Sequence, residues 1–131
     1  MDKNDRLRII REINDFINQI NSEPVQESLV LVEGKRDREA LAYLGCSGSI
    51  MIYHNFKSPI DMVDKFRDNY KKLIILLDLD RSGELMTKKI CSMLGNRYID
   101  QKYRNRLSNI TQGRVKNIEE LKSFYNSMLI D

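Results

Sequence analysis

The hydrophobic positions of the chain predict a helix followed by alternating strands and helices. In the first twenty residues, apolar side chains recur at spacings of three and four, as on a helix with one apolar face: Leu7, Ile9, Ile10, Ile13, Phe16, Ile17 and Ile20. Pro24 and its polar neighbours interrupt this pattern before SLVLV (residues 28–32), a run typical of a buried strand. We therefore expect an N-terminal amphipathic helix and linker over residues 1–26, and the main domain over residues 27–131.

The strand and helix pattern then repeats. Asp37 can cap a helix that ends at Gly45, and SIMIY (residues 49–53) predicts the next strand. Ser58 and Pro59 mark the start of another helix. Its expected buried face consists of four side chains: Ile60, Val63, Phe66 and Tyr70.

The strongest strand pattern is KLIILLD, residues 72–78. A helix should open at Ser82 or Gly83 and end at Gly95. Its expected inward side chains are Leu85, Met86, Ile90, Met93 and Leu94.

The end of the chain predicts a short strand at residues 97–100 and two helices, at 101–109 and 117–129. Strands that alternate with helices at this spacing form parallel sheets through right-handed crossovers. With 131 residues and 41% hydrophobic content, the chain can build one core. We expect an α/β fold: a single compact domain whose central, mostly parallel sheet of about four strands is flanked by helices.

Charge and composition narrow the class of protein. Charged residues make up 31% of the chain, and no apolar run approaches the roughly 20 residues that span a bilayer. The N-terminus also lacks the apolar stretch of a signal peptide, so we expect a cytoplasmic protein without a membrane partner. Residues 1–84 contain 13 basic and 15 acidic residues, whereas residues 85–131 contain 9 and 4. A basic C-terminal third suits a polyphosphate ligand, although a solvated helix face has the same composition.

Two predicted strands end in acidic residues. Glu33 follows the first strand, and Asp78 ends the strand KLIILLD with Asp80 two positions later. The carboxyl ends of parallel strands meet at one edge of a sheet, and side chains two apart on an extended segment point the same way. Gly34 and Gly83 would allow a sharp turn and a close backbone approach beside these acids. We expect the three carboxylates to converge.

Neighbouring carboxylates repel one another unless a cation compensates their charge. Mg²⁺ prefers oxygen ligands and typically binds one or two carboxylates together with phosphate oxygens, and Mn²⁺ is an alternative. Asp78 and Asp80 would therefore be metal ligands, with Glu33 as a third ligand or as the catalytic acid or base. Asp80 has a simpler interpretation as the cap of the next helix.

Two motifs in order resemble the Toprim domain, which topoisomerases, primases, RecR-type recombination proteins and small nucleases share. These motifs are LVLVEGKRDREALAYLG and KLIILLDLDRSGE, and the resemblance covers roughly residues 27–95. It implies a Rossmann-like fold in which Glu33 takes the position of the family's glutamate and Asp78 and Asp80 form its metal-binding DxD motif. The ending YIDQKYRNRLSNITQGRVKNIEELKSFY is similar to that of small stand-alone Toprim proteins and of the ribonuclease that matures 5S ribosomal RNA.

Three classes of function stay open. The first is a small Mg²⁺-dependent nuclease, with structured RNA favoured over DNA as its partner. The second is a non-catalytic nucleic-acid adaptor or a subunit of a larger RNA- or DNA-processing complex. The third is a metal-dependent phosphatase or phosphotransfer receiver, but DLDRSG lacks the Thr or Val that usually follows a phosphatase DxD.

A nuclease also needs cations for the substrate phosphates. Lys35, Arg36 and Arg81 adjoin the acids in sequence, and His54 and Asn55 follow the second strand as further candidates for substrate contact. Five cations of the basic C-terminal third would bind the nucleic-acid backbone independently of its sequence: Lys102, Arg104, Arg106, Arg114 and Lys116. Taken alone, Lys35, Arg36 and Arg81 are each better explained as a surface charge or as a salt-bridge partner of a neighbouring acid.

Overall fold

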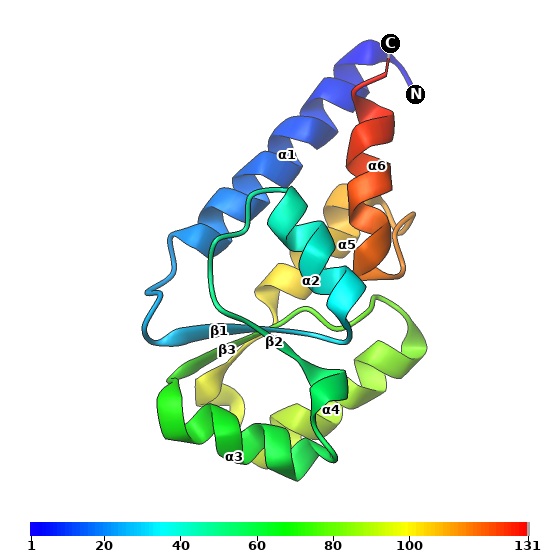
Figure 1. Cartoon of the computed structure of the whole chain (residues 1–131). Helices are drawn as coiled ribbons and strands as arrows, with labels where there is room; N and C mark the ends of the chain where they lie inside the picture. The colour runs from blue at the N-terminus through cyan, green and yellow to red at the C-terminus, as the bar shows by residue number, and fades with distance from the viewer. Residues whose placement is uncertain (131) are drawn as a thin grey trace.

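The computed structural model describes residues 1–130 and has a four-stranded sheet between two layers of helices (Figure 1). The helices and strands are α1 (Lys3–Asn21), β1 (Ser28–Val32), α2 (Lys35–Tyr43), β2 (Ile50–Ile52), α3 (Pro59–Asn69), β3 (Lys72–Ile75), α4 (Arg81–Leu94), β4 (Ile99–Asp100), α5 (Lys102–Thr111) and α6 (Leu121–Met128). Three short 3₁₀ helices complete the fold: η1 (Tyr53–Asn55), η2 (Asn96–Tyr98) and η3 (Ile118–Glu120).

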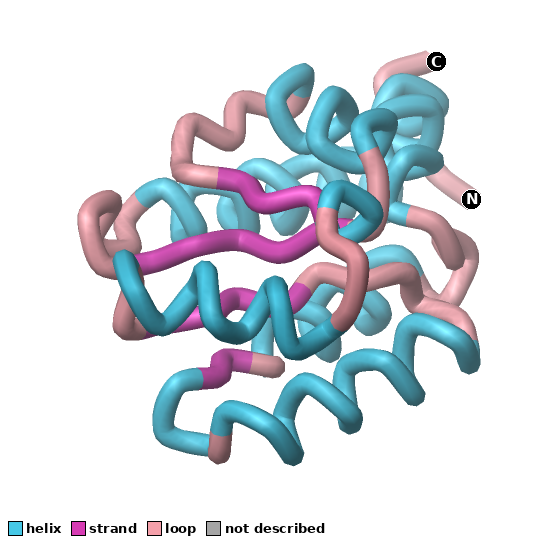
Figure 2. Tube along the Cα trace, turned by 60° about the horizontal axis from the view of Figure 1, so that its bottom comes forward, coloured by secondary structure: helices cyan, strands magenta, loops and turns pink. Residues whose placement is uncertain are grey.

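The sheet has the strand order β2-β1-β3-β4, and all three strand pairs are parallel. Figure 2 shows the four strands lying side by side. Leu31 at the centre of the sheet pairs with Met51 on one side and Ile75 on the other. The prediction of an α/β domain with a mostly parallel sheet of about four strands is confirmed.

The two faces of the sheet bury separate clusters of apolar side chains. Val30 and Val32 of β1 pack with α1, α2, α5 and α6, which lie above the sheet in Figure 1. Leu29 and Leu31 point the other way and pack with α3 and α4. The alternation follows from the two-residue period of a strand, so SLVLV is apolar throughout because both faces are covered.

The N-terminal helix packs on this core through five buried side chains: Ile9, Ile13, Phe16, Ile17 and Ile20. Helix α6 contacts α1, and the Tyr125 hydroxyl donates to Asn14 Oδ1 at 3.1 Å. Within residues 1–130, none of the helices combines the length and the apolar character needed to span a membrane.

Three apolar residues assigned to buried helix faces are exposed instead. Leu7, Ile60 and Leu85 are 47%, 59% and 55% exposed. Each lies off the buried stripe of its helix, which in α3 includes Met62 and in α4 includes Thr87. The prediction that these three side chains face the core is therefore wrong.

The strand predicted over residues 72–78 is shorter than expected. Strand β3 ends at Ile75, although Leu76 and Leu77 remain fully buried and the Leu76 amide donates to Leu31 O at 2.8 Å. The regular pairing stops here because the neighbouring strand β1 also ends near this level. The chain then enters α4 at Arg81, with Asp80 as the cap, rather than at Ser82 or Gly83.

Candidate functional site

The two central strands place Glu33 and Asp78 together. Glu33 follows β1, after which the chain turns into α2 on one face of the sheet, and Asp78 follows β3, after which the chain enters α4 on the other face. Connections that diverge at neighbouring strand ends open a crevice, the usual ligand position in an open parallel sheet. The Asp78 amide lies 3.4 Å from Glu33 Oε1 and donates a hydrogen bond to it.

The charge of Asp78 is unfavourable in this crevice. The pKa of Asp78 rises from 3.8 to about 6, because burial disfavours its ionised form and Glu33 and Asp80 add negative charge and a carboxyl hydrogen bond. The Ile118 amide opposes this effect by donating to Asp78 Oδ1 at 3.1 Å. Among residues 1–130, no ion pair neutralises this carboxylate.

Asp80 is exposed and has a structural role at the start of α4. Its Oδ1 accepts a hydrogen bond of 2.8 Å from the Gly83 amide, as expected of a helix cap. The helix-cap interpretation of this residue is therefore confirmed for one of its two oxygens. Within residues 1–130, no three acidic, histidine or cysteine side chains lie together as a ready-made metal cluster, so the expectation that the three carboxylates converge is wrong.

The two glycines beside the acids differ in what they do. A Cβ on Gly83 would lie 2.0 Å from the Asp78 carbonyl oxygen, so only glycine lets α4 start so close to the aspartate segment. A Cβ on Gly34 would have no contact shorter than 3.6 Å, and Gly34 has an extended backbone with φ of −138°. The expectation that Gly34 is needed for a sharp turn is therefore wrong, since the turn uses conformations open to any residue.

Asp37 is part of this site, although the sequence indicated only a helix cap. The cap position is Gly34, and Asp37 Oδ2 accepts from the Gly34 amide at 3.0 Å. Its Oδ1 accepts a hydrogen bond of 2.8 Å from the Glu119 amide, and this bond links η3 to α2 beside the crevice. Burial and the charge of Asp78 raise the pKa of Asp37. The spacing in EGKRD placed Asp37 near Glu33, but the contact with η3 has no local sequence signal.

Arg104 of α5 holds the aspartate segment by its backbone. Its guanidinium donates to the carbonyl oxygens of Leu77, Asp78 and Asp80, and the bond to Asp78 O is the shortest at 2.7 Å. This arginine is therefore a positioning residue for the loop that carries the two aspartates, in addition to being a predicted phosphate contact.

Comparison with known proteins identifies the family. The Toprim domain family model matches residues 28–119, from the start of β1 into η3. The chain belongs to the Toprim domain family. Toprim domains process or bind nucleic acids and typically bind divalent metal ions.

The relatives of this Toprim protein include small archaeal proteins. A UPF0292 protein from Methanocaldococcus jannaschii is 34% identical over 108 residues, which cover 79% of this chain and 83% of the relative. A UPF0292 protein from Thermococcus gammatolerans is 33% identical over 121 residues, covering 91% and 82%. A solved structure of a protein from Aquifex aeolicus matches with a TM-score of 0.66 and 29% identity, covering 81% of this chain and 94% of that chain.

The predicted cations of the Toprim protein lie in two hollows beside the acids. The first, about 330 Å³, contains two cations beside four acids and is lined by nine residues: Glu33, Gly34, Lys35, Arg36, Asp37, His54, Asp78, Asn117 and Glu119. The second, about 730 Å³, lies on the other side of the aspartate segment and is lined by eight residues: Leu79, Asp80, Arg81, Glu84, Arg104, Asn105, Ser108 and Lys116. Five of the eight predicted cations are thus brought beside the carboxylates.

The other three predicted cations line neither hollow. Lys102 pairs with Asp100, which also binds Lys72 at the opposite end of β3 from the acids. Arg106 donates to Gln19 Oε1 of α1, and Arg114 is exposed. Only Arg104 and Lys116 of the basic C-terminal third are therefore placed for a substrate at this site.

The donor chemistry of the crevice fits a hard divalent cation. The side chains of Glu33, Asp78 and Asp80 offer only oxygen ligands, and burial, together with the charges of Glu33 and Asp80, raises the pKa of Asp78. Mg²⁺ commonly binds through one or two carboxylates and completes its shell with water and phosphate oxygens. The pair Glu33 and Asp78 meets that requirement, and the second oxygen of Asp80 could join it.

Proposed function

We propose that this protein is a small Mg²⁺-dependent nuclease that hydrolyses phosphodiesters, with structured RNA favoured over DNA. The observation that carries the proposal is the contact between Glu33 and Asp78 at the ends of the two central strands. Membership of the Toprim family supports a nucleic-acid substrate. The raised pKa of Asp78 supports a site that gains from a cation.

Each side chain of the site would have a separate role in phosphodiester hydrolysis. Glu33 and Asp78 would hold Mg²⁺ or Mn²⁺ with Asp80 as a further ligand, and Glu33 would also orient and deprotonate the attacking water. The bound ion would polarise the scissile phosphate and stabilise the leaving oxygen. Lys35 and Arg36 would bind phosphates on one side of the acids.

The second hollow would hold the substrate on the other side. Arg81, Arg104 and Lys116 line it without an ion pair among residues 1–130, and Asn105 and Ser108 add neutral polar groups. Cations on both sides of a carboxylate pair allow a phosphodiester to cross the crevice. Contacts of this kind recognise the nucleic-acid backbone rather than its sequence.

A second candidate function is a non-catalytic nucleic-acid-binding subunit. Asp78 and Asp80 each use an oxygen to bind a backbone amide, of Ile118 and Gly83 respectively. These contacts would also stabilise the fold of a module that binds nucleic acid without cleaving it. Such a module would act with protein partners in a larger RNA- or DNA-processing complex.

Cleavage of labelled substrates separates these functions. Structured RNA, single-stranded RNA and duplex DNA would be incubated with the full chain in Mg²⁺, Mn²⁺ or EDTA. The nuclease predicts metal-dependent cleavage of structured RNA that both Glu33→Gln and Asp78→Asn abolish, whereas Asp15→Asn on the exposed side of α1 leaves it intact. Salt-sensitive binding without cleavage by the wild type would favour the non-catalytic subunit.

A further inference from the structure

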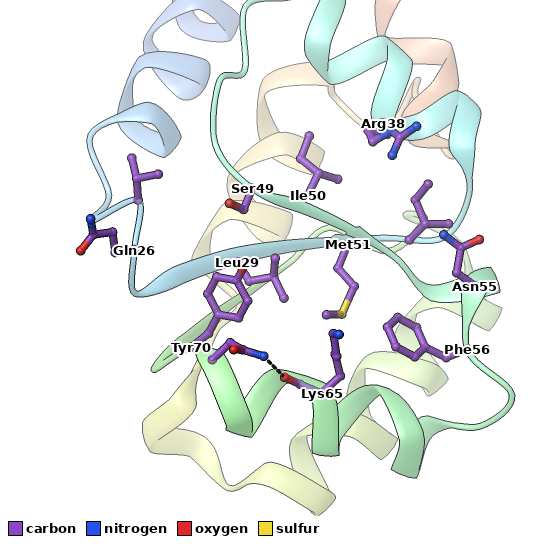
Figure 3. Close-up of a pocket in the computed structure, with 13 residues that line it drawn as sticks. Gln26, Leu29, Arg38, Ser49, Ile50, Met51, Asn55, Phe56, Lys65 and Tyr70 are labelled. Carbon is purple, nitrogen blue, oxygen red and sulfur yellow. Dashed lines mark hydrogen bonds between the residues drawn. The ribbon is translucent and has the colours of Figure 1, made fainter.

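A groove of about 590 Å³ follows the free edge of β2, outside the residues assigned to cleavage (Figure 3). Within residues 1–130, β2 pairs only with β1, so the backbone groups on its other side are open to a ligand. Arg38 of α2 lies on one side of the edge, and Lys65 and Tyr70 lie on the side of α3. The groove therefore has a polar backbone edge between two cationic sides.

The lining of this groove has a distinctive chemistry. Of the described residues that line it, none is acidic, and two are cations, Arg38 and Lys65. Phe56 and Tyr70 are partly exposed. Both pack against the lower core, the cluster between the sheet and helices α3 and α4, where Tyr70 stacks on Phe66 at an interplanar angle of 14°. Three side-chain amides complete the polar part: Gln26, Asn55 and Asn69.

The groove adjoins the hollow that contains the acids. His54 lines that hollow and the next residue, Asn55, lines the groove. In the same way, Asp37 lines the hollow and Arg38 lines the groove. The N-terminal turn of α2 and the 3₁₀ helix η1 thus line both the hollow and the groove, so the two are adjacent parts of one surface.

We infer that this groove binds a single-stranded segment of the nucleic acid whose phosphodiester lies at the carboxylates. The bases would stack on Phe56 and Tyr70, and Arg38 and Lys65 would bind the phosphates. Rigid aromatic rings beside cations are the usual platform for single strands. The inference rests on the proposed function for the identity of the ligand.

An extended peptide is the other ligand that an open strand edge can bind. Its backbone would pair with β2, and only an acidic peptide would also use the charges of Arg38 and Lys65. The continuity with a site for phosphodiesters favours the nucleic acid.

The test measures binding in EDTA, so that it does not depend on cleavage. Fluorescence anisotropy would follow a fluorescein-labelled single-stranded oligouridylate bound to the full chain and to Arg38→Gln/Lys65→Gln. The control, Lys3→Gln/Arg11→Gln, removes the same charge from exposed positions on α1. The inference predicts that the groove variant binds about tenfold more weakly and the control less than about twofold, because Lys3 and Arg11 line neither the groove nor the two hollows. Equal weakening in both variants would overturn it.

The aromatic platform is tested separately with Phe56→Leu and Tyr70→Leu, which keep an apolar side chain against the lower core. Each should weaken oligouridylate binding about threefold to tenfold through the loss of a stacked base. An oligomer containing 4-thiouridine should cross-link to the peptides that contain Phe56 or Tyr70. Cross-links confined to α4 and α5, or tighter binding of a polyglutamate peptide than of the oligomer, would refute the groove as a site for single strands.

These outcomes are independent of the cleavage assay. A protein that cleaves RNA but binds the oligomer equally well in both double variants would refute the groove alone. A protein that does not cleave RNA, yet binds the oligomer through Arg38 and Lys65, would refute the nuclease and support the groove.

Discussion

Asp78 is held where its negative charge is disfavoured. Its neighbours include Glu33 and Asp80, and the favourable contact on its carboxylate is the amide of Ile118. Residues at functional sites often reduce stability in this way, because the arrangement suits a ligand rather than the free protein. A divalent cation would remove the repulsion that Asp78 experiences in the metal-free protein.

The first prediction concerns the pH dependence of stability without metal. Because the pKa of Asp78 is higher in the folded protein, the folded state binds this proton more tightly than the unfolded chain. Its contribution is therefore fully present below pH 4 and is lost as the pH rises towards 6. Asp78→Asn should stabilise the protein at pH 7 by about 1 kcal/mol, a value reduced from the full shift for solvent screening.

Thermal unfolding in EDTA at pH 4.5 and pH 7 measures this effect. Asparagine keeps an oxygen for the Ile118 amide, so the comparison isolates the charge. The variant should gain stability over the wild type at pH 7 and much less at pH 4.5, whereas the exposed control Asp15→Asn should be unchanged at both. A variant that is destabilised at pH 7 would show that the negative charge of Asp78 is favourable.

The second prediction compares the two glycines of the site. Gly83→Ala should destabilise the protein by about 3 kcal/mol, because its Cβ would overlap the Asp78 carbonyl oxygen. Gly34→Ala should change stability by less than about 1 kcal/mol, because its backbone is extended and its nearest neighbour is at ordinary contact distance. Urea unfolding of both variants measures the difference. Equal losses of stability would contradict the close approach at Gly83.

At the scale of elements, the segment between β3 and α4 is fixed by parts of the chain far away in sequence. Arg104 binds its carbonyl groups, the Leu79 amide donates to Lys116 O at 2.6 Å, and Ile118 binds Asp78. The C-terminal third therefore shapes the site as well as carrying its positive charge.

The third prediction follows from this arrangement. Arg104→Lys keeps the charge but replaces a planar fork with a single ammonium group, which cannot bind the same set of carbonyls. Hydrogen exchange at the amides of residues 76–80 should become faster, and the affinity for Mg²⁺ should fall about tenfold, as for other losses of contacts that orient ligands. The exposed Arg114→Lys is the matched control. Unchanged exchange in Arg104→Lys would show that the hydrogen bonds of Arg104 do not hold the aspartate segment in place.

The sequence predicted the elements and the acidic strand ends because these depend on local patterns. The run from Leu73 to Leu77 is apolar and Asp78 follows it, and an acid that follows a central parallel strand lies at the ligand-binding edge. The contacts of Arg104 and Asp37 could not be predicted, since their partners are 26 and 82 residues away. The same limit applies to the C-terminal cations, because α5 turns Arg106 towards Gln19 rather than the crevice.

At the scale of the whole molecule, the acids lie beside two hollows that contain five of the predicted cations, and next to a groove without acidic residues. The net charge of only +3 hides this arrangement, because acidic residues elsewhere offset the cations. Binding of a polyanion would depend on the local cations rather than on the total charge.

The fourth prediction is a steep dependence of RNA binding on salt. Each phosphate bound in a single strand contributes about −0.7 to the slope of log K against log salt. Lys116→Gln should therefore make the slope shallower by about that amount, whereas Lys3→Gln should leave it unchanged. Binding isotherms between 50 and 300 mM KCl would be compared in EDTA. A salt-independent affinity would show that the predicted contacts between cations and phosphates do not form.

The central claim is that Glu33 and Asp78 act together through one divalent ion. Titration calorimetry of the full chain with Mg²⁺ tests it most directly, in parallel with Glu33→Gln, Asp78→Asn and the control Asp15→Asn. The account predicts saturable binding by the wild type and the control, and its loss in both site variants. Equal binding by all four proteins, or none by the wild type, would contradict it.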